Sequence, residues 1–344
     1  MTKQRIFMFL CLIVLTIIAI WLGVSIGALK ADLTLPANLV WHAISGEERT
    51  QLENIAQNIR LPRVLMAFMV GASLAISGAS LQGICRNPLA DPGLLGISSG
   101  AAVAAVAVIL FSSQYAYFEV MGSYAVSAAA VGGAATTAFI VYRLAQVDGK
   151  LQVPTLLLAG VALNSLGVAI IGLFNYLADE QSLRLITFWL LGSLGGANWL
   201  SVSILFPALS VGLVLTYWHR HNINLLLLGE ANAEFSGVNV DRVKQQLLWL
   251  NALTVGVAVA FSGIIAFVGL VVPHILRVMS DTNYRFLLLN SALLGGALMV
   301  IADMFSRIMV APAELPVGIL TALIGAPFFI LILNLQKRKF GFSL

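Results

Sequence analysis

The sequence predicts an all-α polytopic membrane protein, a bundle of ten transmembrane helices in a single domain over residues 1–344. Of its 344 residues, 60% are hydrophobic and only 10% are charged. A soluble globular domain carries roughly 25% charged residues, so this chain has too little polar surface to coat a soluble particle. A membrane helix needs about 20 mostly apolar residues, so the length accommodates about ten spans and no large soluble domain.

Apolar runs set the order of the expected spans. The first run, 6–28, follows Lys3 and Arg5 and is longer than the roughly 7–15-residue core of a cleaved signal peptide, so we expect it to stay as a span. Runs bounded by charges, Pro or Gly predict nine more spans: 61–83, 93–112, 117–142, 151–177, 187–217, 246–265, 266–280, 286–308 and 316–335. Pro273 interrupts the short eighth span, and such segments survive only where neighbouring protein satisfies the freed backbone groups.

The distribution of basic residues orients the chain. With the N-terminus inside, thirteen of the nineteen Lys and Arg residues fall on the cytoplasmic side of this topology. Cytoplasmic loops of membrane proteins carry an excess of Lys and Arg, so the count favours two cytoplasmic termini. The basic residues are scattered singly, so we expect no nucleic-acid partner.

Enzyme and metal signatures are absent from the sequence. It contains no GxxxxGK[ST], HExxH, GxSxG or paired-cysteine motif, and its four histidines are dispersed. We therefore expect no catalytic residue, no cofactor and no metal site; His274 and Asp303 are the only plausible catalytic atoms, and nothing places them together. Uphill work by such a chain would need ATP hydrolysis elsewhere.

Charges inside the expected spans are few. Ionisable residues within spans mark proton or ion relays, so their scarcity disfavours an ion-coupled carrier, although an autonomous channel or carrier stays an alternative. Asp303 lies four residues before Arg307, where the two can meet on one helix face. We expect a structural or surface pair near the outer end of the ninth span.

Three arginines lie at the expected outer boundary. Arg60 and Arg63 open the second span and Arg307 closes the ninth. They could extend along the interface to water, as arginines at helix ends often do. Alternatively they form a docking site for carboxylates of a soluble partner, since Arg binds carboxylates through two parallel hydrogen bonds.

The longest polar insertion is the cytoplasmic segment 219–246, which contains LLLLGEANAEFSGV (225–238). Its apolar and small residues alternate with Glu230 and Glu234, which suits one or two short helices at the membrane surface. The segment is either a solvated loop or a surface that receives force from a cytoplasmic motor protein.

A weak internal repeat is visible. Arg60 begins a segment ending in AISG and NPLADPG (75–78 and 87–93), and Arg242 begins one ending in AFSG and VVPHILR (260–263 and 271–277). On the expected topology the two segments cross the membrane in opposite directions, as inverted repeats of transporters do. Chance similarity between apolar helices explains the pattern equally well.

Five stretches of the sequence carry a family resemblance: RLPRVLMAFMVGASLAISGASLQGICRNPLADPGLLGISSGAA (60–102), LLLAGVALN (156–164), LLGEANAEFSGV (227–238), GIIAFVGLVVPHILR (263–277) and AELPVGILTALIGAPFFI (313–330). The motifs appear in order and cover nearly the whole chain. Together they resemble the FecCD-type permeases, the membrane subunits of bacterial ABC importers for haem, ferric siderophores and cobalamin.

This resemblance implies a ten-helix subunit in the bacterial inner membrane that works as a dimer, of identical chains in the haem and cobalamin types. It implies two copies of a cytoplasmic ATPase, a periplasmic binding protein, and a substrate path along the dimer axis. Arg60, Arg63 and Arg307 match arginines that pair with glutamates of the binding protein. The residues that match the ATPase-coupling helices are Leu228, Gly229, Glu230, Ala231, Ala233, Glu234, Phe235 and Gly237.

The substrate expected from the resemblance is haem, because NPLADPGLLGISSGAA and FWLLGSLGGANW (188–199) look most like haem permeases. Ferric siderophores and then cobalamin are the alternatives. Tyr176 and Arg184 could touch the substrate on its path, as could His42 from the outer side, although each could equally be an ordinary loop or interface residue.

Overall fold

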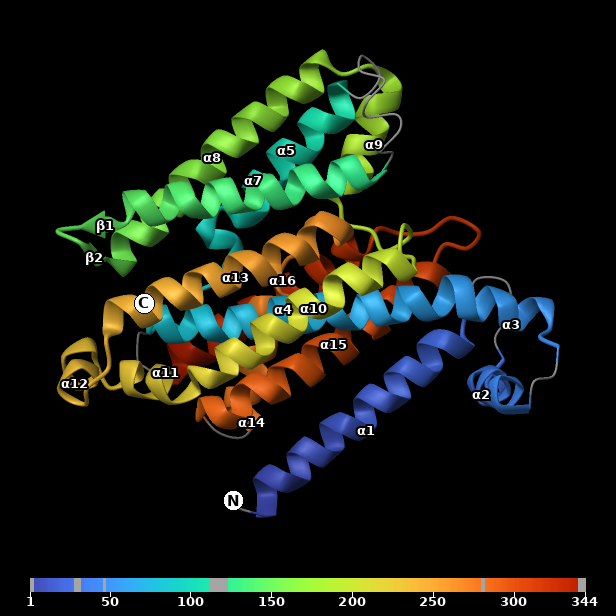
Figure 1. Ribbon diagram of the computed structural model, residues 1–344, viewed down its shortest axis with the longest axis horizontal. Helices are drawn as coiled ribbons and strands as arrows, with labels where there is room; N and C mark the ends of the chain where they lie inside the picture. The colour runs from blue at the N-terminus through green and yellow to red at the C-terminus, as the bar shows by residue number, and fades with distance from the viewer. Residues whose placement is uncertain (1–2, 28–31, 46–47, 112–122, 280–281, 340–344) are drawn as a thin grey trace.

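Helices make up nearly all of the structure, a computed structural model that describes residues 3–27, 32–45, 48–111, 123–279 and 282–339 (Figure 1). Within these described residues, seven helices are long and apolar enough to cross a membrane, and there are three shorter apolar helices, Ile97–Phe111, Val268–Met279 and Val317–Leu331. Together they occupy the positions of the ten expected spans, which confirms the all-α polytopic fold. The spanning helices are α1 (Lys3–Ser25), α4 (Leu61–Cys85), α5 (Ile97–Phe111), α7 (Ser123–Leu144), α8 (Val153–Leu177), α10 (Trp199–Trp218), α13 (Val240–Ser262), α14 (Val268–Met279), α15 (Tyr284–Ile308) and α16 (Val317–Lys339).

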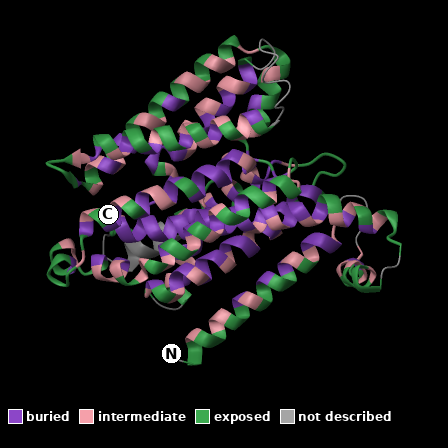
Figure 2. Ribbon diagram, in the orientation of Figure 1, coloured by how far each residue is buried: buried purple, intermediate pink, exposed green. Residues whose placement is uncertain are grey.

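Helix α4 is the centre of the bundle, and almost all its residues from Pro62 to Ile84 are buried (Figure 2). Its small residues let neighbouring backbones come close, which is how membrane helices pack in the absence of a hydrophobic drive between them. A Cβ at Gly78 would overlap the carbonyl oxygen of Gly269 in α14, and one at Gly71 would overlap that of Gly295 in α15. These glycines therefore fix the distance between α4 and its two neighbours.

The helices around α4 expose large apolar side chains. On α8 these include Leu158, Val161, Leu166 and Val168, and on α16 they include Leu323 and Ile324. In a membrane protein such surfaces face lipid or a neighbouring chain. Helices α5, α7, α8 and α9 (Glu180–Leu190) form one group, separate in Figure 1 from the group around α4, and α13 packs against both α7 and α4.

Helices α4 and α13, which belong to the two segments of the weak internal repeat, run in opposite directions, as an inverted repeat requires. The Ser77 hydroxyl lies 2.7 Å from that of Thr254, and Asn251 donates to Ser80 at 3.5 Å. Each helix is followed by a break, at η2 (Pro92–Leu95) before α5 and at residues 263–267 before α14. Both breaks line one cavity of about 270 Å³. Pro273 lies inside α14 without ending it, so the interruption falls before this helix.

The expected span 187–217 is wrong in its first part. Residues 180–190 form α9, a separate helix capped by Asp179, and α10 begins only at Trp199. Gly192 has a φ of +74°, which favours glycine and turns the chain after α9. Asn198 and Ser201 then form a capping box that starts α10. The expected start of the fourth span, 117–122, lies outside the described residues.

The short elements gather at the two ends of the bundle (Figure 1). At the α2 end, α2 (Leu35–Ser45), α3 (Gln51–Ile55) and the π-helix η1 (Ala56–Arg60) lie beside the C-terminal end of α1. At the α12 end lie α11 (Arg220–Leu227), α12 (Glu230–Phe235) and the antiparallel hairpin β1 (Gln146–Val147) and β2 (Lys150–Leu151). Helix α1 begins on the side of the α12 end.

Candidate docking and coupling sites

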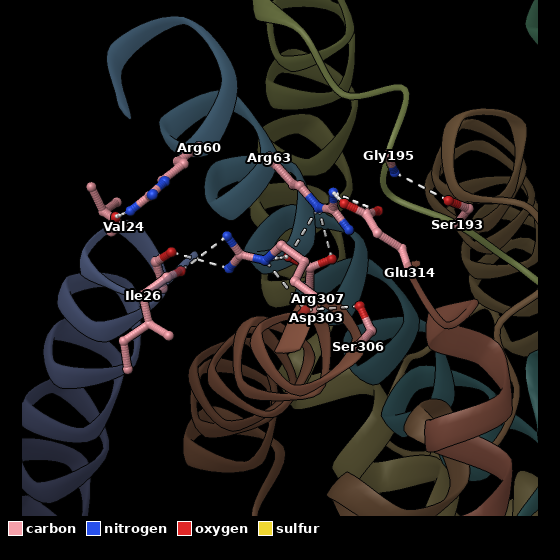
Figure 3. A network of polar contacts seen from close by, with 11 residues as sticks. Val24, Ile26, Arg60, Arg63, Ser193, Gly195, Asp303, Ser306, Arg307 and Glu314 are labelled. Atoms are coloured by element: carbon pink, nitrogen blue, oxygen red, sulfur yellow. Dashed lines mark hydrogen bonds and ion pairs between the residues drawn. The ribbon is translucent and has the colours of Figure 1, made fainter. Parts of the chain in front are cut away.

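Two of the predicted docking arginines donate hydrogen bonds to backbone carbonyls at the C-terminal end of α1 (Figure 3). Arg60 donates to the carbonyl oxygens of Val24 and Ser25 at 3.2 and 3.1 Å. Arg307 donates to those of Gly23 and Ile26 at 3.0 and 3.3 Å. The last carbonyls of a helix have no partner within it and carry partial negative charge, so the guanidinium groups satisfy them and oppose their dipole.

The third arginine lies between two carboxylates. Arg63 Nε donates to both oxygens of Asp303 at 3.0 and 3.2 Å, and Nη1 donates to Glu314 at 2.9 and 3.0 Å. Arg307 Nε lies 3.2 Å from Asp303 Oδ2, one of the two oxygens that Arg63 contacts, which confirms the expected i, i+4 pair. Asp303 is 1% exposed, so this pair is buried and not on the surface. A buried charge is tolerated when it is paired and hydrogen-bonded, as each is here.

These contacts correct one alternative from the sequence. Arg60, Arg63 and Arg307 are all buried, so they do not extend along the interface to water. Their docking role stays a prediction, and within this network Glu314, 43% exposed, is the carboxylate open to water. The sequence reasoning missed Glu314, which lies in the apolar-flanked AELP stretch after α15.

The first part of the predicted segment 219–246 folds as two short helices, α11 and α12. Its last residues, 240–246, are instead the first turns of α13, which begins six residues before the expected span 246–265. Gly229, with a φ of +111°, turns the chain between α11 and α12, and Gly237, with a φ of +85°, follows α12. Ala233 is buried against the bundle, whereas Phe235 is 91% exposed and Leu228 is also exposed. Exposed apolar side chains on a water-facing end of a protein are typical of interaction sites. Ala231, Glu234 and Gly237 are exposed around them.

Polar contacts fasten α11 to the bundle. The Asn224 side chain accepts from the backbone N–H of Tyr284 at 3.0 Å and donates to Asn283 at 3.1 Å. The buried Tyr284 hydroxyl donates to the Ala79 carbonyl in α4 and accepts from Arg277 of α14 at 3.1 Å. The first half of the predicted coupling segment is thus tied to three spanning helices, a set of contacts that the sequence did not reveal.

A buried lysine fastens α12. Lys244, on the first turns of α13, lies 2.6 Å from Glu230 of α12 and donates to the Leu151 carbonyl of β2 at 3.3 Å. Arg86, the residue after α4, lies 3.7 Å from the other oxygen of Glu230. The sequence reasoning identified Glu230 but treated Lys244 only as one of the cytoplasmic basic residues.

The predicted substrate-path residues lie at the corner between α8 and α9. Tyr176 is 86% exposed, and Arg184 is exposed with a 3.7 Å ion pair to Glu180. Asp179 accepts a hydrogen bond from the backbone of Ser182, which lowers the pKa of its carboxyl group and keeps an anion at this corner. His42 lies elsewhere, in α2, where its Nδ1 is 2.9 Å from Glu53. Among the described residues no cluster of His, Cys, Asp or Glu could hold a metal ion.

A family model, the FecCD transport family, matches residues 7–334. The chain belongs to this family. It is 40% identical to the hemin transport system permease protein HmuU of Yersinia pestis, over 98% of each chain. It is 37% identical to the vitamin B12 import system permease protein BtuC of Escherichia coli, over 96% of each.

A solved structure described as an inward-facing metal-chelate type ABC transporter matches this FecCD permease with a TM-score of 0.82 and 30% identity. The match covers 95% of this chain and 98% of the chain in that structure. PsaBC from Streptococcus pneumoniae shares the fold alone, at 15% identity and a TM-score of 0.51. The protein is accordingly a multi-pass inner-membrane permease of an ABC importer, a transport subunit whose family implies an ATPase and a substrate-binding partner.

Proposed function

We propose that this FecCD permease carries haem from the periplasm to the cytoplasm. The observation that supports haem is the similarity to the hemin permease along essentially the full length of both chains. Permeases for vitamin B12 are nearly as similar, at 37% identity over 96% of the chain, so cobalamin and ferric siderophores are the competing substrates. Two identical permease chains, two ATPase subunits and one periplasmic binding protein form the working importer.

The α12 end faces the cytoplasm in this proposal, with both chain termini, and the α2 end faces the periplasm. The excess of Lys and Arg residues on the proposed cytoplasmic side supports this orientation. The ATPases bind α11 and α12, where Leu228 and Phe235 offer exposed apolar contacts. The binding protein docks at the α2 end, above Arg60, Arg63 and Arg307.

The transport cycle follows from this arrangement. ATP binding draws the two ATPases together and moves α11 and α12, and the helices around the dimer axis then change access from the periplasm to the cytoplasm. The exposed faces of α8 and α16 are the proposed dimer surfaces, with Tyr176 and Arg184 near the periplasmic entrance. The chain itself supplies a path without tight substrate ligands.

Uptake by reconstituted proteoliposomes tests the substrate. The permease, its ATPase and its binding protein are assembled with ATP inside, and import of haem, a ferric siderophore and cobalamin is compared. We expect haem to be imported fastest and only with ATP. Faster import of either competitor would overturn haem, and accumulation by the permease alone would favour an autonomous carrier.

Docking at the α2 end is tested by replacing Arg60 with Gln, which keeps a donor for the Val24 carbonyl but removes the charge. We expect the binding protein to bind about tenfold more weakly, the loss of one well-placed charge pair. Arg143→Gln is the control, because Arg143 is exposed in the last turn of α7, at the opposite end of the bundle. Unchanged affinity in both Arg60→Gln and Arg307→Gln chains that melt like the unmodified protein would contradict the docking site.

A further inference from the structure

Leu151, the last residue of the β1–β2 hairpin, is held from both sides by α13. Its backbone N–H donates to Asp241 at 3.2 Å, and its carbonyl accepts from Lys244 at 3.3 Å. Asp241 and Lys244 are three residues apart and so share one helix face. The hairpin is therefore fixed to the first turns of α13, and it cannot move relative to them without breaking one of these two hydrogen bonds.

Lys244 reaches a second element with the same ammonium group. The group lies 2.6 Å from Glu230 at the start of α12, while the lysine is only 2% exposed. An ammonium has three donors, so one Lys244 side chain bonds the Leu151 carbonyl and the Glu230 carboxylate together. Among the described contacts, this is the one side chain that joins α12 directly to the hairpin.

The hairpin is a tight turn with contacts to the elements on both sides of it. Asp148 and Gly149 both have positive φ, the two-residue turn that matches the twist of paired strands. Gln146 donates to the Tyr142 hydroxyl at 2.7 Å, and the Tyr142 ring packs on Trp249 of α13. Gln152 closes the base of the hairpin on Ala145, and α8 begins directly after it at Val153.

From this geometry we infer that Lys244 is the positioning residue that transmits movement of α12 to the β1–β2 hairpin and so to α8. The inference rests on the proposed contact between α12 and the ATPase. When α12 moves, Glu230 pulls or releases the Lys244 ammonium, and the Leu151 carbonyl bonded to the same group moves with it. The exposed face of α8 then changes its position relative to the partner chain.

Arg86 does not replace this link. It lies 3.7 Å from Glu230, it is about half exposed, and it follows α4 instead of contacting the hairpin. An exposed ion pair at this distance contributes little. Arg86 therefore adds only a weak contact between α12 and the end of α4. Among the hydrogen bonds of the described residues, those of Lys244 connect α12 with Leu151.

The test replaces Lys244 with Met, which keeps the length of the side chain and removes its donors. The assembled importer, with ATPase and binding protein in lipid nanodiscs or liposomes, is assayed for substrate imported per ATP hydrolysed. We expect this ratio to fall about tenfold, the usual size of one coupling interaction, while ATP hydrolysis stays within about twofold. Arg242→Met is the matched control, because Arg242 is an exposed cation on the same helical turn.

Hydrogen exchange of residues 146–151, with and without ATP, gives a second readout. We expect the hairpin of the unmodified importer to change its exchange when ATP binds, and that of the Lys244→Met importer to stay constant although α12 still responds. Lys244→Arg keeps donors and should restore part of the ratio. It also provides the assembled protein if Lys244→Met fails to assemble. The comparison is then with Lys244→Gln, whose side chain is shorter, carries no charge and has two donors in place of three. A substrate-to-ATP ratio in Lys244→Arg equal to that in Lys244→Gln would overturn the inference.

Failure of the inference and failure of the proposed function look different. If α12 does not contact the ATPase, Phe235→Ser leaves ATPase binding unchanged in an otherwise unmodified chain. If the ATPase binds α12 but Lys244→Met imports as much substrate per ATP as Arg242→Met, or its hairpin still responds to ATP, the inference is wrong and the proposed function stands.

Discussion

The two ends of the bundle both use buried cations, but they enclose them differently. At the α2 end, Arg63 and Arg307 surround Asp303, and all three side chains are almost fully buried. At the α12 end the buried Lys244 meets Glu230, whose side chain is 36% exposed. Separating the arginines from Asp303 would leave unpaired charges in the interior, whereas Glu230 can leave its partner and enter water. The same kind of pair thus makes a fixed platform at one end and a releasable link at the other.

The substitution Asp303→Asn tests the α2 end and has the largest expected effect. The change leaves two buried arginines without their shared carboxylate, so we expect the free energy of unfolding to fall by roughly 3–5 kcal/mol. Thermal or denaturant unfolding in detergent measures it. Glu180→Gln, which disrupts the exposed pair with Arg184, should leave stability unchanged. Equal stability of the two variants would show that the α2 end is not a fixed platform.

An intermediate effect is expected from Phe235→Ser at the α12 end. Phe235 is 91% exposed, so its removal should change stability by less than about 0.5 kcal/mol. An exposed aromatic at the centre of an interface commonly contributes about 2 kcal/mol, so ATPase affinity should fall roughly thirtyfold. Co-purification and a binding titration measure this loss, with Ser236→Ala as the neighbouring control. Full co-purification would place the ATPase contact elsewhere.

The smallest effect is expected from Glu314→Gln, and its direction is informative. Glu314 is half exposed, so losing its pair with Arg63 should cost less than about 1 kcal/mol of stability. The change also frees one edge of Arg63 for a carboxylate of the binding protein. We therefore expect affinity for that protein to rise a few-fold, opposite to Arg60→Gln. A fall in affinity would mean that Glu314 itself belongs to the docking surface.

The helical bundle was predictable because each membrane helix satisfies its own backbone and so leaves a local apolar run in the sequence. The Asp303–Arg307 pair was equally local, four residues apart on one helix. Helix α9 was missed because its apolar residues and those of α10 form one nearly continuous apolar run. The two features that divide the helices, Gly192 and the Asn198 cap, are single residues that do not stand out in the sequence.

The long-range contacts were beyond reach of the sequence. Arg63 meets Asp303 across 240 positions, and nothing local says that the outer arginines are buried against α1 instead of open to water. Lys244 was missed because its partners lie in the hairpin and in α12. The DRVK stretch did hold a signal, since it places Asp241 and Lys244 on one face at the start of a helix.

The capping of α1 has a consequence for how the protein is made. The terminal carbonyls of the first helix are satisfied by Arg60 and by Arg307, which is synthesised 284 residues after Gly23. Arg307 is synthesised late, so the carbonyls of Gly23 and Ile26 lack its hydrogen bonds until α15 has been made, whereas Arg60 is available early. A polypeptide truncated before α15 lacks these two hydrogen bonds, so we expect the end of its first helix to be less stable than in the full-length permease.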